Sequence, residues 1–132
     1  NYSKNYWKKY AEKVLKLHDK KKYIKILEIG SNDGYLLKQF KDKGHNVLGV
    51  DASPYIVNIA LKNKIKTKLG IFDENFAKKI LNKMGKYDVV IANNVFNHSD
   101  NPLDFIKGVE IFQGFINIAK RQCFGLNINS LV

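Results

Sequence analysis

The chain has 132 residues and a mass of 15.2 kDa, which is the size of a single domain. With 45% hydrophobic and 12% aromatic residues, it is too apolar to be disordered. It has no apolar run of the roughly 18–20 residues that a membrane span requires. The lone cysteine, Cys123, excludes an intramolecular disulfide and a cysteine-based zinc site, and the three histidines lack the spacing of metal ligands. We therefore expect a cytoplasmic protein with no membrane segment and no metal.

The net charge of +11 arises from 23 basic and 12 acidic residues, a balance that is compatible with nucleic-acid binding. However, Arg121 is the only arginine, and recognition of phosphates and bases usually relies on arginine. The lysines lie along the whole chain, with short clusters at residues 20–22 and 62–68. Because the codons for Lys, Asn and Ile are AT-rich, genomic base composition explains the excess at least as well as a nucleic-acid partner does.

Hydrophobic periodicity predicts an amphipathic helix at residues 5–18, followed by a basic turn at 19–22. Strands and helices then alternate. The predicted strands are 24–29, 46–51, 66–69, 87–92 and 114–118, and the predicted helices are 35–43, 54–63, 74–84 and 102–112. This alternation is typical of a doubly wound, mostly parallel α/β sheet, which binds ligands at the carboxyl ends of its strands. We expect one domain over residues 1–132, with the N-terminal helix and turn at 1–22 and the core at 23–132.

The turn after the first strand reads Glu28-Ile29-Gly30-Ser31-Asn32-Asp33-Gly34. Its G-x-x-x-G spacing differs from the G-x-G-x-x-G of dinucleotide-binding enzymes, and the chain has no P-loop. Two acidic side chains would repel a pyrophosphate but suit a cationic ligand. The alternative interpretation is an ordinary strand-to-helix turn that uses glycine for its geometry.

Asp51 ends the second predicted strand, 21 residues after Gly30. At this place a carboxylate can accept both hydroxyls of a ribose. The alternative role is the N-cap of the next helix, but Ser53 before Pro54 suits that role better. Together, the turn and Asp51 indicate a nucleoside that has no pyrophosphate and carries a positive group, a description that S-adenosylmethionine fits.

Residues 26–34, followed by Val50 and Asp51, resemble the first two motifs of class I S-adenosylmethionine-dependent methyltransferases. The amino-acid sequences of residues 28–37 and 91–98 resemble, more narrowly, the deoxysugar C-methyltransferase-like family. Members of that family tend to carry a Tyr-Trp-x-x-(His/Tyr)-Ala helix before the core, and residues 6–11 match it. The resemblance covers about residues 5–108 and implies a Rossmann-like class I methyltransferase fold with S-adenosyl-L-methionine as cofactor.

The resemblance also implies roles for individual residues. The turn would wrap the methionine part, Asp51 would hold the ribose, and Phe72 would border the adenine, although a core position suits Phe72 equally well. Two asparagines after a buried strand are poor strand formers, which favours a site over packing. The implied cofactor-binding residues are Glu28, Gly30, Ser31, Asn32, Asp33, Gly34, Asp51, Ala52, Ser53, Gly70, Phe72, Asn93, Asn94 and Val95.

His98 is the implied catalytic residue, as a general base or as a hydrogen-bond partner of a sugar hydroxyl. The alternative is a loop histidine, oriented by Asp100, with no chemical role. The tail at residues 121–132 lacks the tyrosine and the Glu-His segment of the sugar-methylating family, so we expect a core truncated after about five strands. Its open sheet edge would allow a homodimer.

The function that the resemblance implies is methyl transfer to a small molecule, namely a carbon of a nucleotide-linked deoxysugar. The alternatives are an RNA methyltransferase and a catalytically incomplete cofactor-binding fragment. On the sequence alone, Asp51→Ala is expected to weaken cofactor binding while leaving the thermal midpoint of the ligand-free protein almost unchanged.

Overall fold

The structure is a computed structural model that describes residues 2–93, 100–112 and 115–118. Its centre is a five-stranded parallel sheet in the order β3-β2-β1-β4-β5. The strands are β1 (Lys25–Ile29), β2 (Asn46–Asp51), β3 (Thr67–Leu69), β4 (Val89–Ala92) and β5 (Phe115–Ile118). The chain first winds from β1 outward to β3 and then returns to the other side of β1. The carboxyl ends of β1 and β4 therefore flank the topological switch point, where such sheets bind ligands.

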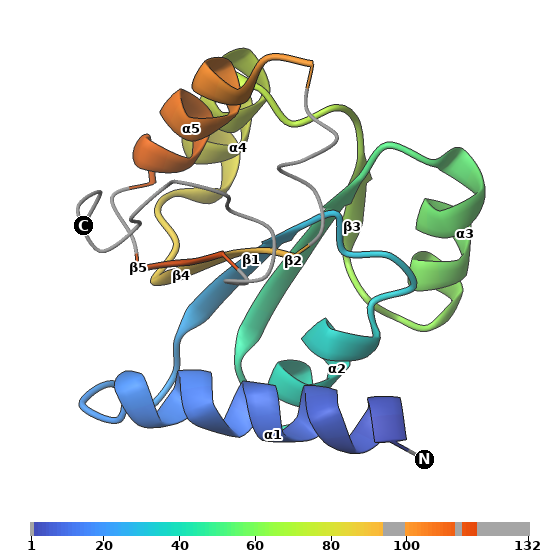
Figure 1. Cartoon of the computed structure of the whole chain (residues 1–132), viewed down its shortest axis with the longest axis vertical. Helices are drawn as coiled ribbons and strands as arrows, with labels where there is room; N and C mark the ends of the chain where they lie inside the picture. The colour runs from blue at the N-terminus through green and yellow to red at the C-terminus, as the bar shows by residue number, and fades with distance from the viewer. Residues whose placement is uncertain (1, 94–99, 113–114, 119–132) are drawn as a thin grey trace.

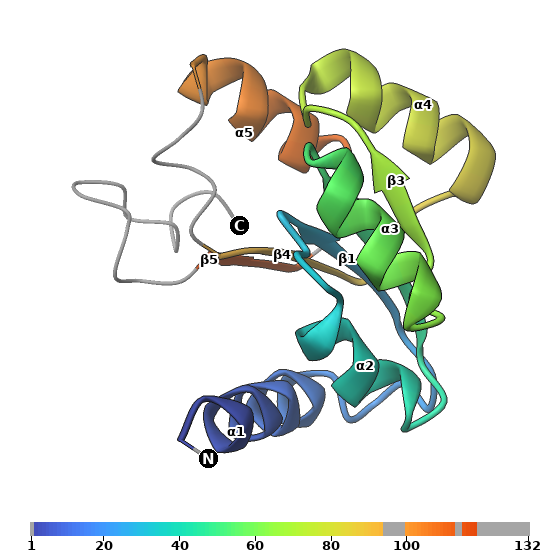
Figure 2. The same ribbon diagram turned by 90° about the vertical axis from the view of Figure 1, so that its right-hand side faces the viewer.

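Helices cover both faces of this sheet (Figures 1 and 2). One face carries α1 (Tyr2–Leu17), α2 (Tyr35–Lys41) and α3 (Pro54–Lys62), and the other carries α4 (Glu74–Met84) and α5 (Pro102–Glu110). The described part of the chain has no helix that is both long and apolar enough to cross a membrane. The expectation of a doubly wound, Rossmann-like α/β fold behind an N-terminal helix is confirmed.

Side chains along β1 alternate between two hydrophobic cores, as the two-residue period of a strand requires. Leu27 and Ile29 belong to the core under α4 and α5, whereas Ile26 belongs to the core under α1 and α2. By the same alternation Glu28 faces the α1 side. Glu28, the only acidic residue of β1, and Ile29 therefore lie on opposite faces of the sheet.

The helices begin where the sequence offers a capping side chain. Ser53 Oγ accepts a hydrogen bond from Ile56 N at the start of α3, Asp73 Oδ1 accepts one from Phe76 N at the start of α4, and Asn101 Oδ1 accepts one from Asp104 N at the start of α5. The predicted helices all form; α4 has the predicted bounds, and the ends of the others differ by at most three residues. The last predicted strand, 114–118, is described as β5 from Phe115 to Ile118, and residue 114 lies outside the described residues.

Helix α1 runs antiparallel to the strands and is anchored near both ends of the sheet. Near its C-terminal end, Lys21 Nζ lies 2.9 Å from Asp88 Oδ1, just before β4. At the middle of the helix, Tyr10 lies beside Asn93, which directly follows β4. The middle of α1 therefore lies at the carboxyl edge of the sheet, where the candidate site is.

Candidate functional site

The turn between β1 and α2 is curled by three residues with left-handed backbone conformation, Gly30 (φ 69°), Asn32 (φ 53°) and Gly34 (φ 84°). The amides of Gly30 and Ser31 both donate to the carbonyl oxygen of Val50, at 2.7 and 3.1 Å. Asn32 N donates to Asp51 Oδ2 at 3.0 Å. Since the end of β2 already occupies these three donors, they cannot cradle a pyrophosphate, which agrees with the departure from the dinucleotide-binding spacing.

The backbone geometry requires glycine at position 34, independently of any ligand. A Cβ atom at this position would lie 2.8 Å from Cβ of Ile65, and its positive φ is strained for any other residue. A second close approach explains Gly49 in the middle of β2, because a Cβ there would lie 2.3 Å from Oγ of Ser31. The Ser31 hydroxyl is therefore directed toward β2 and is buried there.

Asp51 is braced at the carboxyl end of β2. Its Oδ2 accepts from Asn32 N and its Oδ1 accepts from Ser53 N, both at 3.0 Å. The N-cap role belongs to Ser53, as the sequence predicted. Each carboxylate oxygen has a second lone pair, so Asp51 can still accept two hydroxyl hydrogens.

This arrangement changes the expectation for Asp51→Ala. The substitution would leave two backbone amides without their acceptor. An unsatisfied amide costs roughly 1–3 kcal/mol when it is buried, and the cost is smaller here because the Asn32 bond is exposed and the Ser53 bond is only partly buried. We therefore expect the alanine variant to lose stability as well as ligand affinity, and we use Asp51→Asn as the probe below.

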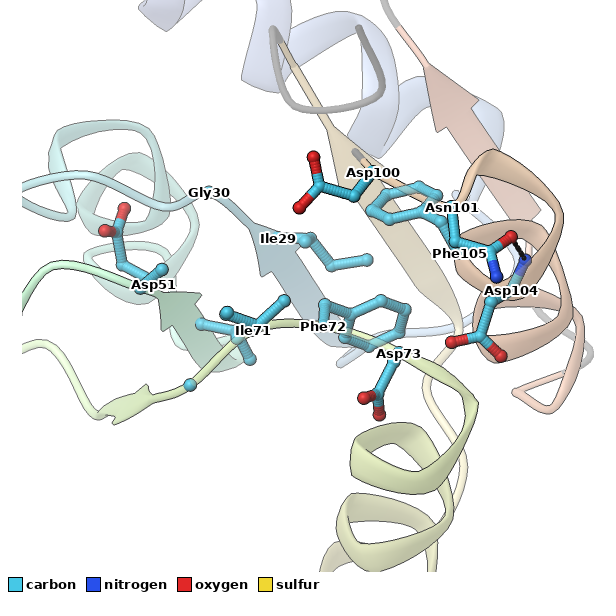
Figure 3. A pocket seen from close by; sticks show the side chains of 13 residues that line it. Ile29, Gly30, Asp51, Ile71, Phe72, Asp73, Asp100, Asn101, Asp104 and Phe105 are labelled. Carbon is cyan, nitrogen blue, oxygen red and sulfur yellow. Dashed lines mark hydrogen bonds between the residues drawn. The ribbon is translucent and has the colours of Figure 1, made fainter. Parts of the chain in front are cut away.

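A cavity of about 550 Å³ opens beside Asp51, on the α4 and α5 side of the sheet (Figure 3). This volume falls within the range of roughly 300–1,000 Å³ that is usual for small-molecule sites. Its wall is formed by the carboxyl ends of β1 and β2, the loop from β3 to α4, and the first turn of α5 with the residues before it. In Figure 3, Asp51 and Asp104 lie at opposite ends, with the apolar side chains of Ile29, Ile71 and Phe72 between them.

The cavity is acidic although the chain is strongly basic. Four of the 12 acidic residues line it, namely Asp51, Asp73, Asp100 and Asp104. The Phe72 side chain lines the cavity, yet it is only 7% exposed and packs edge-on against Phe105, with 5.5 Å between the ring centroids, so it also belongs to the core. A nucleoside, with a flat base and several donor groups, matches this combination of apolar walls and carboxylate acceptors.

On the other face of the sheet, polar atoms are buried without a partner. Oε2 of Glu28 and both polar side-chain atoms of Asn93 accept or donate no hydrogen bond within the described residues. The hydroxyl of Tyr10 lies beside Asn93, but the pair does not reach hydrogen-bond geometry. Burial raises the pKa of the Glu28 carboxyl well above its usual range, and the charges of Asp33 and Asp51 act in the same direction. Such groups call for a polar ligand or water, and a cationic ligand would favour the ionised carboxylate.

The structure thus unites several predicted residues and separates others. The cavity is lined by Gly30, Asp51, Ala52, Gly70 and Phe72. Glu28 and Asn93 lie toward α1, and Ser53 caps α3. Asp33 Oδ1 accepts from Tyr35 N within the turn. Asn94, Val95 and His98 lie outside the described residues.

Sequence reasoning missed Tyr10 as a neighbour of Asn93, and it missed Asp73, Asp104 and Phe105 in the cavity. A signal for the cavity residues was present, because they follow β3 and β4 in sequence and the carboxyl ends of parallel strands share one edge of the sheet. Among the described residues, there is no cluster of three or more His, Cys, Asp or Glu side chains that could bind a metal ion.

Residues 2–110 match the protein family described as "Methyltransferase domain". This match covers most of the chain, which therefore belongs to that family. A curated relative, the ubiquinone biosynthesis O-methyltransferase of Pelagibacter ubique (strain HTCC1062), is 32% identical over 84 residues, which are 64% of this chain and 35% of that protein.

Solved structures with the same fold are also methyltransferases. The plantazolicin methyltransferase BpumL, in complex with a pentazolic desmethylPZN analog and SAH, aligns with a TM-score of 0.65 at 21% identity, over 85% of this chain and 44% of that one. A SAM-dependent methyltransferase from Archaeoglobus fulgidus aligns with a TM-score of 0.59 at 17% identity, over 82% and 48% of the two chains. The chain spans about a third of the length of the curated relative and less than half of these two structures.

Proposed function

We propose that this chain is the S-adenosylmethionine-binding core of a methyltransferase that acts on a small molecule. The observation that carries the proposal is the braced carboxylate of Asp51 beside an acidic cavity of about 550 Å³, at the switch point of a methyltransferase-family sheet. The family match, the curated relative and the solved neighbours support it.

The residues present fit the cofactor on both sides of the sheet. Asp51 would accept the ribose hydroxyls, and the walls formed by Ile71 and Phe72 would border the adenine. The unpaired Glu28 carboxyl and the Asn93 amide would receive the polar methionine end. Ser31, Asn32 and Asp33 would contribute mainly through the shape of their turn, since the amides of Ser31 and Asn32 already donate to Val50 and Asp51. When bound, the cofactor supplies a methyl group that its sulfonium makes electrophilic.

The chain's own part in catalysis is to align the reactants and to exclude water. Buried Glu28 lies near two further carboxylates, and a cationic ligand relieves their mutual repulsion. The turn is already held by Val50 and Asp51, so it needs no rearrangement to receive the ligand.

Two acceptor classes follow from two different observations. The amino-acid sequences of residues 28–37 and 91–98 support a carbon of a nucleotide-linked deoxysugar as the methyl acceptor. His98 would then take the proton from that carbon. The relative named as an O-methyltransferase of ubiquinone biosynthesis supports a phenolic hydroxyl instead. Asn94 and Val95 would contact the cofactor with either acceptor.

Isothermal titration calorimetry with S-adenosylhomocysteine tests the cofactor. We expect binding at micromolar or weaker affinity, and no binding of NAD⁺, whose pyrophosphate meets acidic side chains and occupied amides. Tighter binding of NAD⁺ than of S-adenosylhomocysteine would overturn the proposal.

The acceptor is tested with radiolabelled S-adenosylmethionine and two panels, nucleotide-linked keto-sugars and simple phenols. Transfer to one panel identifies the acceptor class. Transfer that persists unchanged in His98→Ala shows that His98 is not the base. Transfer to RNA but to neither panel would contradict a small-molecule acceptor.

A further inference from the structure

A second hollow, of about 260 Å³, lies between β3 and α4. We call it the lysine groove. Lys68 and Leu69 of β3 form one side, and Phe76, Lys79, Ile80 and Lys83 of α4 form the rest. It shares no lining residue with the acidic cavity, although the loop from β3 to α4, residues 70–73, connects its two sides and lines that cavity.

The ammonium groups of the lysine groove have no acidic partner in the described part of the chain. Among the described side chains, no carboxylate lies within ion-pair distance of Lys68, Lys79 or Lys83, whereas Lys78 on the same helix pairs with Glu74 at 3.2 Å. Lys79 and Lys83 are four residues apart on α4, a spacing at which like charges repel. Lys66 adds a fourth charge nearby, since its Nζ lies 3.7 Å from Sδ of Met84.

Protection of a sheet edge explains only part of this arrangement. β3 is the outermost strand, and lysines on an edge strand discourage pairing with another chain. Lys79 and Lys83, however, lie on a helix and have no such role. Like charges that line one hollow from two elements repel each other, and an anion bound in the hollow would relieve that repulsion.

The floor of the groove is apolar. Ile80 is buried, and the ring of Phe76 lies against the backbone of Gly70, where a Cβ atom would come within 2.3 Å of it. The hollow is smaller than the roughly 300–1,000 Å³ of a typical ligand site. Its size suits one charged group of a ligand rather than a whole cofactor, and lysine holds phosphate as a point charge.

From this geometry we propose that the lysine groove binds the phosphate or diphosphate group of a small molecule, with Lys68, Lys79 and Lys83 around the oxygens and Phe76 against the adjoining apolar part. No covalent change is involved. The proposal is independent of the cofactor site, because the two hollows share no lining residue and have opposite charge.

The test is a titration of ¹⁵N-labelled protein with sodium pyrophosphate in about 150 mM salt, where diffuse surface attraction is screened. We expect amide shifts confined to residues 66–70 and 76–83. The double variant Lys79→Gln/Lys83→Gln should bind at least tenfold more weakly, and glutamine keeps the helix because its helix propensity is close to that of lysine.

The matched control is Lys13→Gln/Lys16→Gln, which removes the same charge from two exposed positions of α1. It should bind pyrophosphate within twofold of the unaltered chain. Equal weakening in both double variants, or shifts spread over all lysine-rich surfaces, would overturn the proposal. A single-stranded oligouridine that depends on the groove lysines, while pyrophosphate does not bind, would overturn it in favour of a nucleic-acid backbone.

Discussion

The acidic cavity and the lysine groove lie on the same strand–loop–helix unit, yet their charges are opposite. The cavity at the loop after β3 has four aspartates in its wall, whereas the groove between β3 and α4 has three lysines. The net charge of +11 would have suggested one basic surface throughout. The net charge of the whole chain therefore does not predict the charge of a particular site, because acidic and basic side chains gather at different places in the fold.

The two hollows also differ in how their charged groups are held. Asp51 and Asp73 accept backbone hydrogen bonds, from Asn32 and Ser53 in one case and from Phe76 in the other. The groove lysines have no such restraint in the described part of the chain. The acids form a preorganised site, while the lysines can adjust to an anion.

Asp51→Asn should have the largest effect on this comparison. The amide keeps one acceptor for the backbone but loses the charge and one of the two acceptors for a ribose. Charge-assisted hydrogen bonds contribute roughly 1.5–3 kcal/mol each. We expect S-adenosylhomocysteine to bind at least about 30-fold more weakly, or about 2 kcal/mol, by calorimetry.

Pyrophosphate binding at the lysine groove should not change in Asp51→Asn. The exposed Asp19→Asn is the control for lost charge, and it should keep the affinity of the unaltered chain. If Asp51→Asn also binds S-adenosylhomocysteine normally, Asp51 is not a ribose ligand.

Glu28→Gln should have the next largest effect, on stability and its pH dependence. Because the pKa of Glu28 is raised in the folded protein, this carboxyl holds a proton that the unfolded chain releases above the ordinary value of 4.5. The free energy of unfolding therefore falls as pH rises above 4.5 and levels off above the raised folded-state pKa. Denaturant unfolding at pH 5 and pH 8 should show that Glu28→Gln removes this decline.

The control for this measurement is Glu110→Gln, at the exposed end of α5. Its pH dependence should match that of the unaltered chain. Parallel pH profiles for all three proteins would mean that the environment of Glu28 does not oppose its ionisation.

Asp73→Asn should have the smallest effect. Asparagine caps a helix as well as aspartate does, so α4 should keep its stability while the cavity loses one negative charge. A partly exposed charge contributes roughly 0.2–1 kcal/mol, so S-adenosylmethionine should bind at most about fivefold more weakly by calorimetry. An effect as large as that of Asp51→Asn would show that total charge, rather than the position of one carboxylate, determines affinity.

Local chemistry made most of the fold predictable. The N-caps at Ser53 and Asn101, each followed by proline, and the glycines after α2 and α4 lie within a few residues of the boundaries they mark. The position of Asp51 at the end of β2 was also predictable, because it follows from the length of that strand.

Contacts between distant segments could not be predicted. Tyr10 lies beside Asn93 only because α1 packs antiparallel to β4, and Gly34 meets Ile65 only because α2 and the end of α3 approach each other. In the sequence, Lys68 and Lys79 do not stand out among the many other lysines. Only the folded structure shows that β3 and α4 bring them to one hollow. Such contacts depend on helix packing, which a single sequence does not encode locally.

The two backbone bonds of Asp51 have a consequence for the entropy of binding. Asp51 thereby ties Asn32, in the turn 19 residues before it, to Ser53 at the start of α3, so that both segments are ordered before any ligand arrives. Immobilising a flexible side chain at the moment of binding costs about 0.5–1.5 kcal/mol. Here folding has already met that cost, so a ligand's contacts with Asp51 contribute almost fully to its affinity.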